Sequence, residues 1–146
     1  MTVVVDANLA VGVAISEQYT PQIIENFTAW RKEDEHLIAP NLLEYEVVSA
    51  LQRAISLNLL ARQEAERVLR IIFQLGIELV YPTQEIHLDA IRWAERISQS
   101  KAYDAQYLAL ASRENAPLWT ADRRLANTAQ ATGATWVHWI GEKEIE

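Results

Sequence analysis

Residues 2–6 of the chain read Thr-Val-Val-Val-Asp, a short run of β-branched residues that ends on an acid. Such a run is apolar on both sides, which predicts a strand covered on both faces of a sheet. A carboxylate at the end of a buried strand is costly to bury alone, so Asp6 is expected to have a task there. Two further apolar stretches also run into acids, at Asp104 and Asp122. If these ends converge, the acids form a metal site.

Short apolar runs of this kind alternate with longer stretches of helical periodicity. The alternation predicts an α/β fold with a mainly parallel sheet of about five strands, flanked by helices on both faces. The expected strands are Thr2–Asp6, Leu37–Ala39, Ile77–Tyr81, Pro117–Thr120 and Thr135–Trp139. The whole chain, residues 1–146, is expected to form a single domain.

Helices are expected between the strands, each marked by one apolar face. Thr20 and Thr83 are expected to be the N-caps of two of them, and Gly76 and Gly133 to follow the ends of two others. Two helices near the middle are expected to form a hairpin joined around 58–61. The expected helices lie around Thr20–Lys32, Asn41–Ile55, Ala65–Phe73, Thr83–Ile97, Tyr107–Ala111 and Arg123–Thr132.

The composition narrows the classes of function. With 13 basic and 20 acidic residues the formal net charge is −7, which argues against a broad basic surface for nucleic acid but not against a local one. The absence of cysteine excludes disulfides and thiolate zinc sites and fits a reducing compartment. No stretch approaches the ~20 apolar residues of a membrane span, and no leader is evident, so a cytoplasmic protein without a membrane partner is expected. The acidic tail, 142–146, is expected to be a solvated end.

Most familiar catalytic motifs are absent from the sequence. The four glycines are too far apart for a dinucleotide fingerprint or a phosphate-binding loop, and the three histidines share no metal-ligand spacing. Carboxylates therefore remain as the candidates. In an open parallel sheet, ligands bind beyond the carboxyl ends of the strands, where the strand order reverses. Asp6 and Asp122 can both lie at this edge, and Asp104 falls in the first turn of a helix that can point toward it.

A fourth acid comes from the segment 40–51, which offers two glutamates. Glu44 lies three residues after Asn41 and can close a capping box at the helix start, which is a structural role. Glu46 lies beside the apolar stripe, on the side of the helix that also carries Arg53. Glu46 is therefore our choice for the site.

Four segments together carry a resemblance to a known family. They are Val4-Val5-Asp6-Ala7-Asn8, then Pro40 followed by Tyr45-Glu46-Val47-Val48-Ser49-Ala50-Leu51, then Tyr103-Asp104-Ala105-Gln106-Tyr107-Leu108-Ala109-Leu110-Ala111, and Leu118-Trp119-Thr120-Ala121-Asp122-Arg123-Arg124-Leu125. On these segments the chain resembles the PIN domain nucleases and, within them, the VapC-like toxins of bacterial and archaeal toxin-antitoxin pairs. The segments occur in the family's order and span nearly the whole chain.

The resemblance implies a role for each matching position. Asp6, Glu46, Asp104 and Asp122 would form the catalytic, metal-binding quartet, and Asn8 and Thr120 would support it. The resemblance also implies RNA cleavage that leaves 5′-phosphate and 3′-hydroxyl ends, a homodimer, and a cognate antitoxin that blocks the cleft.

Three arginines lie near these segments. Arg53, Arg123 and Arg124 are placed to hold an RNA backbone, although exposed ion pairs in an acidic protein explain them equally well.

The chemistry of four clustered carboxylates stands without the family name. Such carboxylates repel one another, so the pKa of one or more should be raised in the empty site. Oxygen ligands without His or Cys select Mg²⁺ or Mn²⁺. The cation can bind a phosphate oxygen, lower the pKa of a water and stabilise charge at phosphorus. The expected function is metal-dependent hydrolysis of RNA phosphodiester bonds.

Two other functions remain open. A phosphatase with Asp6 as nucleophile would need a second acid at position 8, where the chain has Asn8. A catalytically silent PIN-like interaction module would keep the fold without cleavage, although all four acids are present. Taken singly, Asp104 and Asp122 can also be explained as helix caps.

Overall fold

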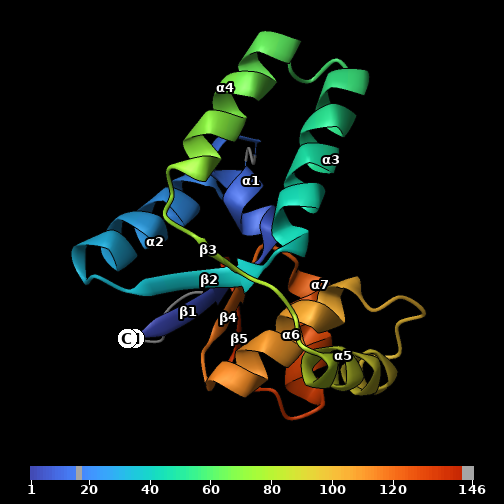
Figure 1. The fold of residues 1–146 in the computed structure, drawn as a ribbon. Helices are drawn as coiled ribbons and strands as arrows, with labels where there is room; N and C mark the ends of the chain where they lie inside the picture. Colours follow the sequence, from blue (N-terminus) through green and yellow to red (C-terminus); the bar gives the residue numbers. More distant parts are fainter. Residues whose placement is uncertain (16–17, 143–146) are drawn as a thin grey trace.

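The predicted apolar runs form one five-stranded parallel sheet in the computed structural model, which describes residues 1–15 and 18–142 (Figure 1). The strands are β1 (Thr2–Val5), β2 (His36–Pro40), β3 (Glu78–Val80), β4 (Leu118–Thr120) and β5 (Val137–Trp139). Their order across the sheet is β3-β2-β1-β4-β5. The predicted α/β class and parallel sheet are confirmed. Of the acidic tail, residues 143–146 lie outside the described residues.

Helices cover both faces of the sheet (Figure 1). They are α1 (Ala7–Ile15), α2 (Thr20–Lys32), α3 (Leu42–Ser56), α4 (Arg62–Phe73), α5 (Gln84–Arg96), α6 (Tyr103–Glu114) and α7 (Arg123–Ala131). The first four lie on one side and the last three on the other, and α3 and α4 form the predicted hairpin, which projects away from the sheet. Within the described ranges 1–15 and 18–142, no helix combines the length and apolarity that crossing a bilayer requires.

The central strand β1 marks the point where the strand order reverses. Its Val4 is paired with Ile38 of β2 on one side and with Leu118 of β4 on the other. The chain builds outward from β1 to β2 and β3, then returns to β4 and β5 on the opposite side. Asp6 follows β1 directly, and its backbone N–H donates to the carbonyl oxygen of Trp119 (3.0 Å). Asp6 is therefore fixed at the carboxyl edge, beside the reversal of strand order.

Helix α6 packs its buried residues against the central part of the sheet. Residues 107–111 of this helix are all fully buried, and they pack against β1 and β2. Val3, Val4 and Val5 of β1 are also buried, as expected for a strand covered on both faces. Burial of this much apolar surface is the main stabilising contribution and sets the position of α6 relative to Asp6.

Small side chains bring α5 close to α6. Ala90 and Ala94 of α5 are buried against Ala105 and Ala109 of α6. Since alanine leaves the least side chain between two helix backbones, the two helices can approach closely along this seam.

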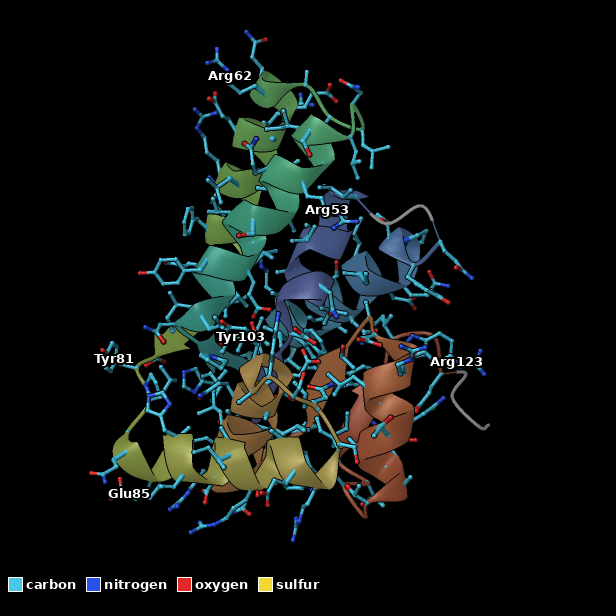
Figure 2. All side chains as sticks on the ribbon, turned by 90° about the vertical axis from the view of Figure 1, so that its right-hand side faces the viewer. Arg53, Arg62, Tyr81, Glu85, Tyr103 and Arg123 are labelled. Carbon is cyan, nitrogen blue, oxygen red and sulfur yellow. The ribbon has the colours of Figure 1, made fainter. Side chains whose placement is uncertain are left out.

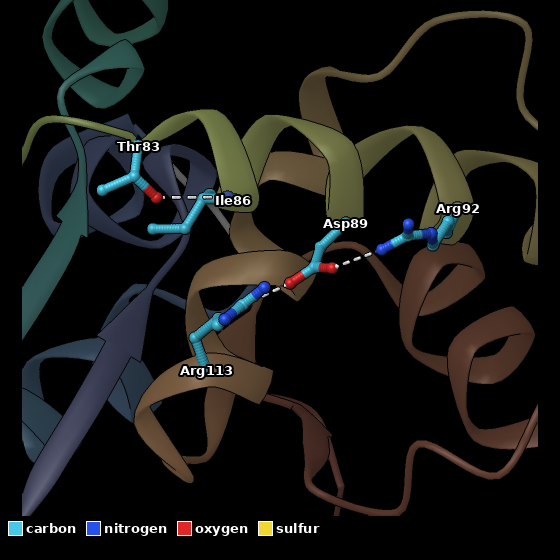
Figure 3. Close-up of polar contacts among 5 residues, drawn as sticks. All are labelled: Thr83, Ile86, Asp89, Arg92 and Arg113. Carbon is cyan, nitrogen blue, oxygen red and sulfur yellow. Dashed lines mark hydrogen bonds and ion pairs between the residues drawn. The ribbon is translucent and has the colours of Figure 1, made fainter.

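A polar clamp fixes the same two helices at their exposed edge (Figure 3). Asp89 of α5 accepts hydrogen bonds from Arg113 Nε of α6 (2.6 Å) and from Arg92 Nη1 (3.1 Å). The Arg113 hydrogen bond is the main reason that the pKa of Asp89 is lowered. The Thr83 hydroxyl accepts from the Ile86 N–H (3.2 Å), which confirms the predicted N-cap of α5. Together, the seam and clamp hold α6, whose first turn carries Asp104.

Two predicted helix caps are wrong, although both helices begin within one residue of their expected positions. The N-cap of α2 is Tyr19, and Thr20 lies inside the helix with its hydroxyl donating to the carbonyl oxygen of Gly12 (2.7 Å). Asn41 precedes α3 but makes no side-chain cap, so the capping box with Glu44 does not form. The reason is tertiary, because the Asn41 N–H is already used by the Val80 carbonyl oxygen (3.1 Å) in the pairing of β2 with β3.

Helix α1 has no counterpart among the predicted helices. Its sequence, Ala-Asn-Leu-Ala-Val-Gly-Val-Ala-Ile, is apolar almost all round and directly follows the first strand. A short run of this kind has no polar face from which a helical period can be recognised. Packing against α2, α3 and α4 explains why nearly all its positions are apolar.

Candidate active site

Three of the four predicted acids line one pocket. Asp6 after β1, Glu46 on α3 and Asp104 on α6 border a hollow of about 370 Å³ at the carboxyl edge of the sheet. The remaining wall comes from α1, including Asn8 and Val11. The acids come from segments about 40 to 100 residues apart in the chain, so this pocket exists only in the folded protein.

Asp6 is the buried acid of the pocket. Burial raises the pKa of its carboxyl from 3.8 to about 7, because the charged form loses its hydration. This value already includes a hydrogen bond from Thr120, which opposes the shift, and the negative charges of Asp104 and Glu46, which contribute to it. A carboxyl with this pKa favours either a proton or a cation at neutral pH.

Thr120 at the end of β4 organises the polar groups around Asp6. Its fully buried hydroxyl donates to Asp6 Oδ2 (2.9 Å) and accepts from Asn8 Nδ2 (3.2 Å) and from the Asp122 N–H (3.0 Å). Asn8 Oδ1 in turn accepts from the Ala121 N–H (3.0 Å). The network joins the ends of β1 and β4 and holds the Asp6 carboxyl in one orientation.

Glu46 is oriented by a buried tyrosine that the sequence pattern places only in the apolar stripe of α6. The hydroxyl of Tyr107 donates to Glu46 Oε1 (2.7 Å). Burial raises the pKa of Glu46, the Tyr107 hydrogen bond lowers it, and the charge of Asp104 raises it. Burial and the charges of Asp6 and Glu46 raise the pKa of Tyr107 far above its usual range, so Tyr107 stays a hydrogen-bond donor. The sequence signal for this role was the presence of Tyr107 within the otherwise mostly small and apolar segment 105–111.

Asp104 occupies the first turn of α6, where the helix dipole favours a negative charge. Its Oδ2 accepts a hydrogen bond from Gln99 Nε2 (3.0 Å). The N-cap of this helix is Ala102, so the alternative interpretation of Asp104 as an N-cap is wrong. Asp104 is half-buried and faces the pocket shared with Asp6.

Asp122 has a structural role at the edge of this group. Its side chain is the N-cap of α7 and accepts from the Leu125 N–H (3.1 Å), while its own N–H donates to Thr120. Asp122 is not among the described residues that line the pocket of the other three acids. The structure therefore brings three predicted acids together and links the fourth to them through Thr120.

Asp122→Ala is expected to lower the free energy of unfolding by about 1 kcal/mol, because α7 loses its N-cap. Asp122→Asn keeps an oxygen that can cap and should cost less than half of that. Urea unfolding of the two variants beside the parent measures the difference. Equal losses in both variants would show that the charge, and not the cap, is the stabilising feature.

The three predicted RNA-binding arginines are exposed and lie outside the described pocket lining. Arg53 lies on α3 seven residues beyond Glu46, so it shares that side of the helix (Figure 2). The guanidinium of Arg123 lies 5.0 Å from the ring centre of Trp139, a cation–π contact. Arg124 follows it in the first turn of α7.

The donor chemistry of the pocket fits a divalent cation. Asp6, Glu46 and Asp104 offer carboxylate oxygens. Burial and, to a lesser extent, mutual repulsion raise the pKa values of Asp6 and Glu46, and a bound cation would offset both effects. In residues 1–15 and 18–142, however, no three His, Asp or Glu side chains are already arranged closely enough to hold an ion. Binding would therefore have to draw the three carboxylates inward.

Comparison with known proteins places this geometry in a family. The family model of the PIN domain matches residues 3–131. This chain belongs to the PIN domain family. The PIN-domain chain is 33% identical over 129 residues to Ribonuclease VapC9 of Mycobacterium tuberculosis strain H37Rv, a match that covers 88% of this chain and 92% of VapC9. The same identity and coverage relate it to the VapC ribonuclease Mb0985 of Mycobacterium bovis. The resemblance predicted from the four segments is confirmed.

Solved structures share the PIN fold of this chain. VapBC2 from Rickettsia felis, bound to a DNA fragment from its promoter, matches with a TM-score of 0.66, 13% identity, and coverage of 94% of this chain and 98% of that one. A toxin-antitoxin complex from Klebsiella pneumoniae matches with a TM-score of 0.63, 17% identity, and coverage of 97% and 99%. At these identities the likeness shows the fold.

Proposed function

We propose that this PIN-domain chain is a VapC-type ribonuclease that hydrolyses RNA phosphodiester bonds with Mg²⁺ or Mn²⁺ and is the toxin of a toxin-antitoxin pair. The observation that carries the proposal is the convergence of Asp6, Glu46 and Asp104 on one pocket, with Asp6 buried. The VapC ribonucleases at 33% identity support the same activity. In this proposal residues 1–146 form one nuclease domain.

The choice of metal follows from the ligands. Carboxylate oxygens without nitrogen or sulfur suit hard cations such as Mg²⁺ and Mn²⁺. When bound, the cation supplies a Lewis acid for a phosphoryl oxygen and stabilises the charge that develops at phosphorus. In the proposal Asp6, Glu46 and Asp104 are the inner ligands. Asp122 is the fourth acid, at the rim.

The residues around the acids prepare them for this task. The Thr120 hydroxyl, itself bonded to Asn8, donates to the Asp6 carboxyl at the end of β1, and the Tyr107 hydroxyl donates to Glu46. Such hydrogen bonds orient ligands and are typical supports of metal sites. Arg53 on α3 and Arg123 and Arg124 on α7 are proposed to contact the phosphate backbone on either side of the acids.

The proposed partners follow from the relatives. VapBC2 and the Klebsiella complex are toxin-antitoxin assemblies whose fold covers nearly all of this chain. We therefore propose a cognate antitoxin that covers the acid pocket, a homodimer as the working form, and the cytoplasm as the place of action. In this proposal the bound antitoxin prevents RNA from entering the acid pocket until the antitoxin is removed.

Chelation with EDTA is expected to abolish RNA cleavage by the purified protein, and added Mg²⁺ or Mn²⁺ to restore it. Ca²⁺ serves as a matched control, because it also binds carboxylate oxygens but in a more flexible coordination geometry than Mg²⁺ requires. Gel analysis should find 5′-phosphate and 3′-hydroxyl ends.

Two other outcomes would contradict the proposed function. Mn²⁺ binding without cleavage of any RNA would instead indicate a silent interaction module. A trapped aspartyl phosphate on Asp6 would indicate a phosphatase.

A further inference from the structure

Each of the three pocket acids has one carboxylate oxygen that accepts a hydrogen bond from a neutral side chain. The pairs are Thr120 Oγ1 with Asp6 Oδ2 (2.9 Å), Tyr107 Oη with Glu46 Oε1 (2.7 Å), and Gln99 Nε2 with Asp104 Oδ2 (3.0 Å). Across the described ranges 1–15 and 18–142, no other side chain donates to these carboxylates. A neutral donor orients a carboxylate without cancelling its charge, so the attraction for a cation is retained.

Tyr107 is the donor that has the least freedom to move away from its acid. Its side chain is fully buried in the part of α6 that packs against β1 and β2, whereas Gln99 is exposed in the loop before α6. Because side chains in a packed interior interdigitate, the Tyr107 ring cannot turn from Glu46 without displacing its neighbours. Its raised pKa keeps the hydroxyl protonated, so the hydrogen bond to Glu46 persists.

The hydrogen bond from Tyr107 makes the two carboxylate oxygens of Glu46 unequal. Oε1 accepts from the Tyr107 hydroxyl, while Oε2 has no hydrogen-bond partner among the described residues. Glu46 itself is half-buried on α3 and borders the acid pocket. A ligand in the pocket therefore meets a glutamate that offers one oxygen, Oε2, and whose second oxygen is already bonded to the protein.

The number of oxygens that a carboxylate offers affects which cation it prefers. Mg²⁺ demands near-octahedral coordination, and a carboxylate that binds through both oxygens places two ligands too close together for that geometry. Ca²⁺ accepts more ligands in a flexible arrangement and commonly binds a carboxylate through both oxygens. A glutamate that is restricted to one oxygen therefore favours the smaller, octahedral cations over Ca²⁺.

We propose that Tyr107 sets the metal selectivity of the acid pocket by occupying Oε1 of Glu46. Glu46 then binds a cation through Oε2 alone, and Mg²⁺ or Mn²⁺ is favoured over Ca²⁺. The inference rests on the proposed function, which supplies the cation. Tyr107 is a positioning residue, because it acts through Glu46 and makes no contact with the cation or with RNA.

Tyr107→Phe keeps the buried ring and removes only the hydroxyl. Isothermal titration calorimetry of the metal-free protein, with MnCl₂ and with CaCl₂ at one pH, measures both affinities without any cleavage. We expect the Kd for Mn²⁺ to rise about 10-fold, because Glu46 loses its orientation. The Kd for Ca²⁺ should stay within about twofold of the parent, since Ca²⁺ gains the second oxygen of Glu46. A merely structural loss would instead weaken both metals by the same factor.

Tyr45→Phe is the matched control. Tyr45 directly precedes Glu46 on α3, is 71% exposed and lies outside the lining of the acid pocket. Removal of its hydroxyl should leave both Kd values unchanged. Glu46→Gln provides a second control, because it removes the charged ligand through which Tyr107 acts. In the Glu46→Gln protein, Tyr107→Phe should not change the ratio of the two Kd values any further.

Infrared difference spectra test the same inference in the parent, without a change at the buried position. Binding through one oxygen widens the separation between the antisymmetric and symmetric carboxylate stretches, and binding through both oxygens narrows it. Addition of Mn²⁺ to protein labelled with ¹³C-glutamate should produce the wide separation. The same band should be absent from the Glu46→Gln protein, which assigns it to Glu46.

The outcomes separate this inference from the function on which it rests. If the parent binds Mn²⁺ and cleaves RNA, but Tyr107→Phe changes neither Kd or raises both equally, Tyr107 does not set the selectivity. A narrow separation of the Glu46 bands in the Mn²⁺-bound parent would also overturn the inference. If the parent binds neither Mg²⁺ nor Mn²⁺, the proposed function fails and the inference fails with it.

Discussion

Replacing Asp6 with Asn is expected to lower the rate of metal-dependent RNA cleavage by roughly 10³-fold or more while the protein still folds. Asn keeps the size of the side chain and can still accept the hydrogen bond from Thr120. It removes the negative charge that is buried deepest in the acid pocket and that a divalent cation needs most. Initial rates of cleavage with saturating Mn²⁺ measure the effect. Asp104→Asn should produce a comparable loss.

Glu44→Gln is the matched control for both variants. Glu44 lies on α3 two residues before Glu46, is exposed, and does not border the acid pocket. The Glu44→Gln substitution also removes one carboxylate, so it tests whether the loss of any single carboxylate near the site lowers the cleavage rate. We expect cleavage by Glu44→Gln to equal that of the parent. If Asp6→Asn and Asp104→Asn both cut RNA at the parental rate, the assignment of the site is wrong.

The metal-free parent protein is expected to lose stability as the pH rises from about 4 to about 7. The pKa of Asp6 is about 7 in the folded state and 3.8 in the unfolded reference, so the folded state holds the proton in this window and the unfolded state releases it. A state that releases a proton is favoured as the pH rises, hence the free energy of unfolding falls, by roughly 3 kcal/mol from Asp6 alone across this window. Glu46, whose pKa is also raised, adds to the loss in the same direction.

Urea unfolding in EDTA, repeated across this pH window, measures the loss. Asp6→Asn cannot titrate at this position, so its stability should change less with pH and should exceed that of the parent near pH 7. Added Mn²⁺ should restore stability to the parent at pH 7 and not to the variant, because a ligand of the folded state stabilises it by mass action. Parallel pH profiles for parent and variant in EDTA would show that Asp6 is not a buried acid with a raised pKa.

Local patterns were sufficient for most of the sheet. All five predicted strands occur within about two residues of their expected ends. The signal is clearest for the central strand β1, where Val3, Val4 and Val5 are apolar in succession because both faces of the strand are covered. Helix caps were less predictable from local rules. The Asn41 N–H is used by Val80 of β3, and the Thr20 hydroxyl by Gly12 of α1, and neither contact can be read from a short window of sequence. A predicted cap fails when a group that it needs, such as the Asn41 N–H or the Thr20 hydroxyl, already forms a hydrogen bond elsewhere.

The sequence alone determined the class of the fold, the family, and the carboxylates as the groups that could carry chemistry. These depend on short-range features: β-branched runs, helical periods, and acids placed just after them. Only the tertiary structure decided which acids meet. Asp6, Glu46 and Asp104 share a pocket because α6 packs against the central strand β1 while α3 packs against α1 and β2. The Asp122 side chain instead caps the start of α7. The tertiary structure also decided that Asp6 is the acid with the most strongly raised pKa and that Tyr107, 61 positions after Glu46, orients that glutamate. Burial and contact depend on long-range packing, and therefore no local pattern could reveal them.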